Sequence, residues 1–124
     1  MADDLRPDVA VGHIHLDVND VAVEYEFFRQ HGMREILKRN DFAILELRGG
    51  THLVIRTTEE ALEPGARAPF DLMVDDIDGA FDGFNTAGCD LTPIERGSIH
   101  DSFTVITPNG YILPINSSHV AGPV

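Results

Sequence analysis

Apolar and polar residues alternate along GHIHLDV, residues 12–18, with the two-residue period of a β-strand. One face of this strand would be apolar, whereas the other would carry two imidazoles and a carboxylate, those of His13, His15 and Asp17. Asp20 then offers a helix N-cap, and apolar residues at helical spacing follow it as far as Gly32. The pattern predicts a strand followed by a helix that ends at this glycine.

The same pattern occurs a second time in the chain. Residues 13–33 align without a gap with residues 69–89 at a shift of 56 positions, and residues 41–55 align with residues 101–115 at a shift of 60. Each copy predicts a strand, a helix and three further strands, the last two of which are joined by a turn that contains glycine. Repetition at this length indicates a duplicated structural unit.

The duplication sets the expected domain organisation. We expect one domain over residues 1–124, with a first unit at 10–57 and a second unit at 67–118, joined by a linker that contains Pro and Gly. Segments 34–39 and 91–95 are the expected strands that follow each helix. The expected fold class is α+β, because one helix per unit covers one face of a four-stranded sheet and leaves the other face open.

The open faces of the two sheets are the candidate site. Strand alternation assigns both polar and apolar side chains to them, including four of the six histidines. This mixture is too polar for a dry core and too apolar for an ordinary surface, and it is typical of a concave face that binds a ligand. The candidate residues are His13, His15, Asp17, Phe42, Glu46, His52, Arg56, Met73, His100 and Ser102.

Composition narrows the choice of partners. The formal net charge of −12 disfavours binding to nucleic acid and to anionic membranes. No apolar run approaches the ~18 residues of a membrane span, and the opening MADDLRPD lacks the order of a signal peptide. Cys89 is the single cysteine, so no intrachain disulfide can form. We therefore expect a cytoplasmic protein whose partner is a small molecule.

The segments GHIHLDVNDVAVEYEFFRQHGM and DSFTVITPNGYILPI resemble the vicinal oxygen chelate superfamily. This superfamily includes glyoxalase I, fosfomycin-resistance enzymes, extradiol dioxygenases and bleomycin-binding proteins. The resemblance implies two tandem βαβββ units that form a β-cup with helices on its outer face, a small organic ligand in the cup, and a homodimer. It is more specific for the fold than for the function, because this fold carries unrelated chemistries.

The resemblance also implies where a metal would bind. In metal-using members the ligands come from the first and last strands of each unit, and these positions match His13, Arg56 or Val54, Pro69 and Pro114. Of these side chains only that of His13 can bind a metal. The expected site is therefore degenerate, and no cofactor is firmly implied.

An improvised metal site is the alternative. In it a divalent Zn, Ni, Mn or Fe ion would bind His13 and His15 together with a third ligand, one of Asp17, Glu46 and His100. Without a metal, His13, His15 and His100 are the candidate catalytic residues, because imidazole carries protons near neutral pH.

Two charged residues of the first unit have more than one interpretation. Arg56 either holds an anionic group of the ligand or balances Glu46. Asp17 either orients His15 or pairs with a cation. In glyoxalase I the position that corresponds to Asp17 is an arginine that binds a carboxylate of glutathione. The reversed charge therefore disfavours glutathione as a ligand.

Two functional hypotheses fit these patterns. The first is a metal-free protein that binds a small organic molecule in its cup, similar to the bleomycin-binding members. The second is a metal-dependent lyase, isomerase or dioxygenase that uses His13 and His15. The missing metal positions favour the first hypothesis, and the cluster of histidines favours the second.

Overall fold

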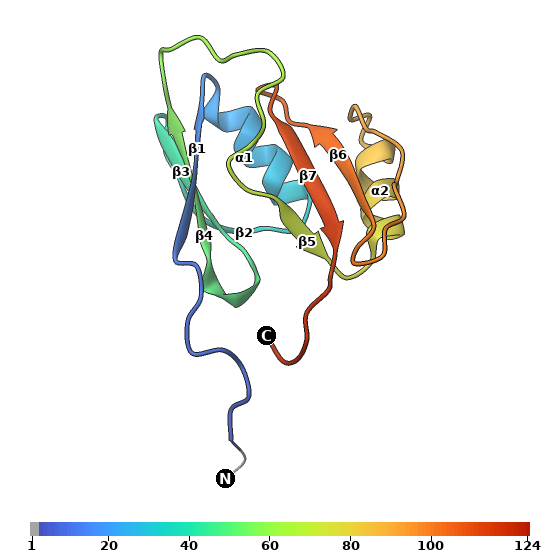
Figure 1. Ribbon diagram of the computed structural model, residues 1–124. Helices are drawn as coiled ribbons and strands as arrows, with labels where there is room; N and C mark the ends of the chain where they lie inside the picture. The colour runs from blue at the N-terminus through green and yellow to red at the C-terminus, as the bar shows by residue number, and fades with distance from the viewer. Residues whose placement is uncertain (1–2) are drawn as a thin grey trace.

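The computed structural model describes residues 3–124, which form two consecutive units that lie side by side (Figure 1). The first unit contains β1 (His13–Val18), α1 (Val21–Gln30), β2 (Arg34–Lys38), β3 (Phe42–Glu46), the short 3₁₀ helix η1 (Arg48–Gly50) and β4 (His52–Thr57). The second unit contains β5 (Leu72–Val74), α2 (Ile77–Thr86), β6 (Ser102–Ile106) and β7 (Ile112–Ser117).

Each unit folds into a sheet of its own. The strand order is β1-β4-β3-β2 in the first sheet and β5-β7-β6 in the second. The strand that opens each unit runs parallel to the strand that closes it, β1 beside β4 and β5 beside β7, and the other neighbours are antiparallel. The expected α+β fold is therefore confirmed. No helix within residues 3–124 is long and apolar enough to cross a membrane.

The ends of both helices are as predicted. The Asp20 side chain accepts a hydrogen bond from the backbone amide of Val23 (3.3 Å), and the equivalent carboxylate at the start of α2 accepts one from Gly79 (2.9 Å). Gly32 and Gly88 follow the helices with φ of 111° and 80°. Residues with a side chain rarely adopt these angles, which explains why glycine ends both helices.

The segment 91–95 departs from the predicted repeat, because it does not form a strand. Isolated bridges hold its two ends, Leu91 and Glu95, against β6. Pro93 lies between them and has no amide hydrogen to donate to a sheet. The prediction of a fourth strand here was wrong: the second sheet has three strands, and residues 92–101 form a loop, the last part of the connection from α2 to β6.

The end of the predicted linker also differs from expectation. Arg67 forms a bridge with Ile112 of β7. On either side of it, the amide of Ala68 donates to the Ile112 carbonyl and the amide of Ile112 donates to the Ala66 carbonyl, both at 2.9 Å. The chain therefore joins the second sheet several residues before β5 begins, which places Arg67 at the edge of that sheet.

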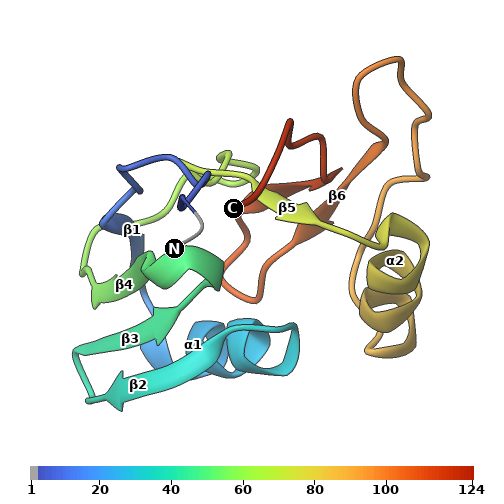
Figure 2. The same ribbon diagram turned by 90° about the horizontal axis from the view of Figure 1, so that it is seen from below.

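A single apolar core joins the two units. Helix α1 lies between the first sheet and the second unit, as both views show (Figures 1 and 2). The ring of Phe27 on α1 stacks on that of Phe84 on α2, with centroids 5.6 Å apart. The helix-facing residues of the first sheet that are completely buried are Val18, Ala43, Leu45, Leu53 and Ile55. One face of the first sheet is thus closed by α1, and its other face is open.

A buried carboxylate also connects the units. The Glu24 side chain on α1 is fully buried and accepts hydrogen bonds from the Thr107 hydroxyl (2.7 Å) and from the backbone and side-chain amides of Asn109 (3.0 and 3.1 Å). Asn109 belongs to the turn between β6 and β7, and its side chain also exchanges two hydrogen bonds with the backbone of Asp20. Burial raises the pKa of Glu24, which the hydrogen bonds partly offset.

Candidate functional site

The open face of the first sheet carries three histidines side by side, and we call it the histidine face. His13 on β1 lies directly opposite His52 on β4, with ring centroids 5.8 Å apart. His15 follows on the same strand, and its ring lies 6.4 Å from that of His13. Glu46 on β3 is the next residue across the sheet, with a carboxylate oxygen 3.9 Å from Nε2 of His52. The structure therefore brings four of the predicted site residues into one cluster.

Asp17 and Arg56 form an ion pair at the far end of this face. Parallel pairing of β1 with β4 sets them opposite each other, and Nε of Arg56 lies 3.1 Å from a carboxylate oxygen of Asp17. The interpretation that Arg56 balances Glu46 was wrong, because Glu46 pairs with Arg34 instead, at 3.1 Å. Asp17 therefore pairs with a guanidinium of its own sheet.

Apolar side chains lie between the charged ends of the histidine face. Ile44 pairs with Val54 in the middle of the sheet, and Phe42 lies opposite Arg56. All three apolar residues are half-buried although no helix covers them. A planar or aliphatic ligand could rest on this strip with its polar groups directed toward the imidazoles.

The histidine face points away from the second unit. Helix α1 occupies the opposite side of the first sheet and contacts the second unit through Phe27 and Glu24. His13 and His15 are consequently exposed in a single chain. Figure 2 shows α1 on the side of the first sheet that faces the second unit, so the uncovered face of that sheet is turned away from the second unit.

The open face of the second sheet forms a pocket of its own, with a volume of about 460 Å³. His100 and Ser102, both predicted site residues, line it together with Arg67, Thr104 and Asn116. Met73 lies outside this pocket and lines an adjoining cleft of about 710 Å³, which also contains the side chains of Val11 and Ile14. The predicted site residues are therefore divided between two surfaces.

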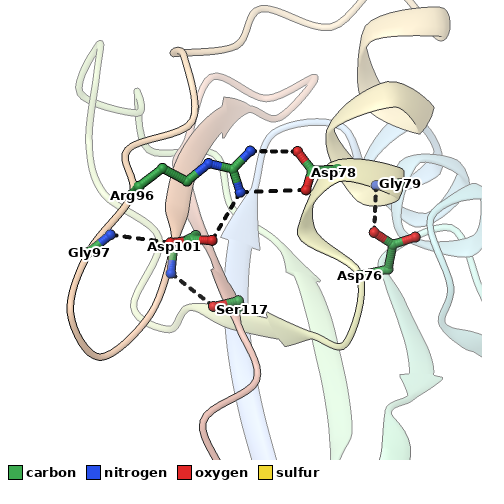
Figure 3. A network of polar contacts seen from close by, with 7 residues as sticks. All are labelled: Asp76, Asp78, Gly79, Arg96, Gly97, Asp101 and Ser117. Atoms are coloured by element: carbon green, nitrogen blue, oxygen red, sulfur yellow. Dashed lines mark hydrogen bonds and ion pairs between the residues drawn. The ribbon is translucent and has the colours of Figure 1, made fainter.

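The loop that carries His100 is anchored by polar contacts of the next residue, Asp101. Nδ1 of His100 is buried, and no group within residues 3–124 lies within hydrogen-bond distance of it. The backbone amide of Asp101 donates to the Ser117 hydroxyl (2.8 Å), and the Asp101 carboxylate accepts from the guanidinium of Arg96 (2.9 Å), as Figure 3 shows. Arg96 also bonds Asp78 of α2 at 2.7 Å. The proximity of the Arg96 guanidinium lowers the pKa of Asp101.

Sequence reasoning missed Arg67 and Arg96. Arg96 anchors the loop 92–101, and Arg67 lines the pocket of the second sheet. Arg67 lay at the start of the predicted second unit, before its first predicted strand, and strand alternation assigns no direction to a residue outside a predicted strand. In an extended chain, residues that are an even number of positions apart point to the same side. The spacing of four between Arg67 and Asp71, another pocket residue, was therefore the signal available in the sequence.

The side chains do not fit a divalent metal. Among residues 3–124 no three His, Cys, Asp or Glu side chains converge as a metal ion requires. The positions implied in the second unit hold Pro69 and Pro114, whose side chains cannot bind a metal. We therefore derive no step through a metal.

The fold is similar to several solved structures. Lactoylglutathione lyase from Agrobacterium tumefaciens superposes with a TM-score of 0.75 at 17% identity, over 94% of this chain and 98% of that one. A glyoxalase/bleomycin resistance protein/dioxygenase from Alicyclobacillus acidocaldarius gives 0.71 at 19% identity, over 94% and 96% of the two chains. The oxidase ChaP-H2 gives 0.72 at 19% identity, over 94% and 98%.

Sequence comparison adds no relative: no protein-family sequence model matches the chain, and no curated protein matches it. The structural likeness confirms the predicted resemblance to the vicinal oxygen chelate superfamily at the level of the fold. The likeness does not assign a function, because this fold hosts many chemistries.

Proposed function

We propose that the protein binds a small organic molecule in a cup lined by the open faces of its sheets, without a bound metal. The observation that carries this proposal is the composition of the histidine face. Three imidazoles and the Glu46 carboxylate surround half-buried Ile44 and Val54 on a sheet face that no helix covers. Apolar contact with a few convergent polar groups is the usual chemistry of a small-molecule site.

The cup of this proposal is completed by a second copy of the chain. Each molecule has one histidine face and one pocket on its second sheet, and these two surfaces point in different directions. A two-fold axis would set the histidine face of one copy against the second sheet of the other, and it would do so twice. The resulting homodimer would enclose His13 and His15, which are exposed in the single chain.

An enzyme is the second candidate, and the clustered imidazoles favour it. His13, His15 and His52 lie close enough to act on one ligand, and imidazole transfers protons near neutral pH. A lyase or isomerase needs such a proton carrier. This candidate differs from the first only in whether the bound molecule is converted.

A thermal-shift screen of metabolites tests the proposal, because a ligand that binds the folded state raises Tm. We expect ligands whose effect disappears in His13→Ala and His52→Ala and persists in Glu26→Ala, which removes an exposed carboxylate of α1 that pairs with Arg29. The shift should survive dialysis against EDTA. Absence of any active metabolite, or the same shift in all three variants, would contradict the proposal.

Two further measurements test the dimer and the choice between binding and catalysis separately. Sedimentation velocity should show a dimer, and a monomer at every concentration that still binds ligand would exclude the shared cup. Chromatography of the ligand after incubation decides between binding and catalysis, because conversion that is lost in His13→Ala would establish the enzyme.

A further inference from the structure

Arg67 differs from most arginines of this chain in having no acidic partner. Six arginines lie within 4.0 Å of a carboxylate, namely Arg6, Arg29, Arg34, Arg48, Arg56 and Arg96. Within residues 3–124 no carboxylate lies within that distance of the Arg67 guanidinium, although Asp71 and Glu95 line the same pocket. In a protein with a net charge of −12, an arginine without such a partner is conspicuous.

The residues around Arg67 supply neutral hydrogen-bond donors. Ser102, Asn116 and His100 line the pocket beside it, as does Thr104, whose hydroxyl already donates to Thr92 (3.2 Å). The pocket therefore combines a guanidinium with hydroxyl, amide and imidazole groups.

A carboxylate matches this set of donors. The planar guanidinium of arginine forms two parallel hydrogen bonds with a carboxylate, and these charge-assisted bonds are stronger than neutral ones. The surface of the protein repels anions in general, so a carboxylate would bind only where such donors converge.

An apolar cleft continues from the same pocket. The cleft of about 710 Å³ shares Arg67, Asp71 and Pro114 with the pocket, and its other walls include Ile14 and Phe70. A molecule with its acidic group at Arg67 could extend its hydrocarbon part into this cleft. The two hollows together fit an amphipathic ligand with one charged end.

We infer that the ligand of this protein is a small organic monocarboxylate, whose carboxylate binds Arg67 and whose apolar part lies in the adjoining cleft. This inference rests on the proposed function, since it names the class of molecule that the cup accepts. It also assigns the specificity to Arg67, which lies on the second sheet, rather than to the paired Arg56 of the histidine face.

Titration of the full chain with acids and their amides tests this inference by two-dimensional ¹H–¹⁵N NMR. The probes are benzoate and hexanoate, and their neutral counterparts are benzamide and hexanamide. We expect the acids to shift the amide signals of Ser102, Thr104 and Asn116 in a saturable manner. Arg67→Gln should weaken the acids about tenfold or more and leave the amides unchanged.

Arg39→Gln is the matched control. Arg39 carries the same charge, and its only side-chain hydrogen bond within residues 3–124 goes to the Lys38 carbonyl. The Arg39→Gln substitution should leave the affinity for both acids unchanged, because Arg39 does not line the pocket. An equal loss in both variants would show that net charge alone is responsible, and this would overturn the inference.

The remaining outcomes separate this inference from the proposed function. If the amides bind as tightly as the acids, or if Arg67→Gln binds the acids normally, the inference is wrong and the ligand-binding cup stands. If neither acids nor amides move any signal, the inference is wrong as well. The cup is then judged by the metabolite screen alone, which does not depend on Arg67.

Discussion

The carboxylate of Glu24 accepts two hydrogen bonds from Asn109, one from its backbone amide and one from its side chain. The two residues are 85 positions apart, on α1 of the first unit and on the last turn of the second. Their contact ties the first unit to the last turn of the second, beside the apolar core that both units share.

Removal of the Glu24 carboxylate should destabilise the whole domain. Glu24→Ala leaves the donors of Thr107 and Asn109 unsatisfied in the core, which costs about 2–3 kcal/mol of the free energy of unfolding. Urea denaturation measures this loss. Glu26→Ala is the control, because Glu26 forms an exposed pair with Arg29 on the same helix and its loss should cost about 0.5 kcal/mol or less. Equal stability of the two variants would contradict the role of Glu24.

The raised pKa of Glu24 predicts how this contribution depends on pH. Burial holds the folded-state pKa above the unfolded-state value, so the folded protein binds the Glu24 proton more tightly. The associated stability is present below the unfolded-state pKa and is lost as the pH rises through the folded-state pKa. We therefore expect the stability of the wild type relative to Glu24→Gln to fall as the pH rises through this window. Urea denaturation at a series of pH values measures the difference, and a rise with pH would contradict the prediction.

The sequence predicted this junction only in part. Local rules were sufficient for Asp20 as a helix cap and for Gly32 at the helix end, since both depend on a few neighbouring residues. Nothing in the sequence indicated that Glu24 is buried, because its position along the helix is compatible with an exposed and with a buried side chain. Its partners lie in the other unit, and one-dimensional patterns do not specify such contacts.

The candidate site shows the same division. Alternation grouped His13, His15 and His52 correctly, because it follows from strand geometry alone. The predicted pairing of Arg56 with Glu46 was wrong. The partner of Arg56 depends on which strand lies beside β4 and on the register between the two strands, and neither can be read from alternation. The direction of the histidine face depends in turn on how α1 packs against the second unit, and the repeat in the sequence contains no information on that packing.

The loop before β6 allows a test of close backbone packing. A Cβ atom added at Gly97 would collide with the carbonyl oxygen of His100, and backbone cannot move aside as a side chain can. Gly97→Ala should therefore destabilise the protein by roughly 1–3 kcal/mol, the usual effect of overpacking. Thermal unfolding measures it. Gly12→Ala is the control, because no atom lies within 4 Å of the added methyl group there. If Gly97→Ala is no less stable than Gly12→Ala, the loop is not as closely packed as described.

The contact between Arg96 and Asp101 predicts both the ionisation and the mobility of the loop that carries His100. The guanidinium lowers the pKa of Asp101, so the pair stabilises the fold at neutral pH and is lost as the pH falls through that lowered pKa. In Arg96→Gln the pKa of Asp101 should rise toward its ordinary value, which carboxyl ¹³C NMR follows directly. Hydrogen exchange at the Asp101 amide, which bonds Ser117, should become about tenfold faster as the loop opens more often.

Arg48→Gln removes a different exposed ion pair, the one with Asp75, and provides the comparison. It should leave both the pKa of Asp101 and the exchange of its amide unchanged, because the pair lies outside the loop 92–101. Unchanged exchange in Arg96→Gln would mean that the backbone contacts of Asp101 and Ser117 hold His100 without help. Faster exchange in Arg96→Gln together with weaker binding of benzoate would instead show that the position of His100 contributes to the pocket of Arg67.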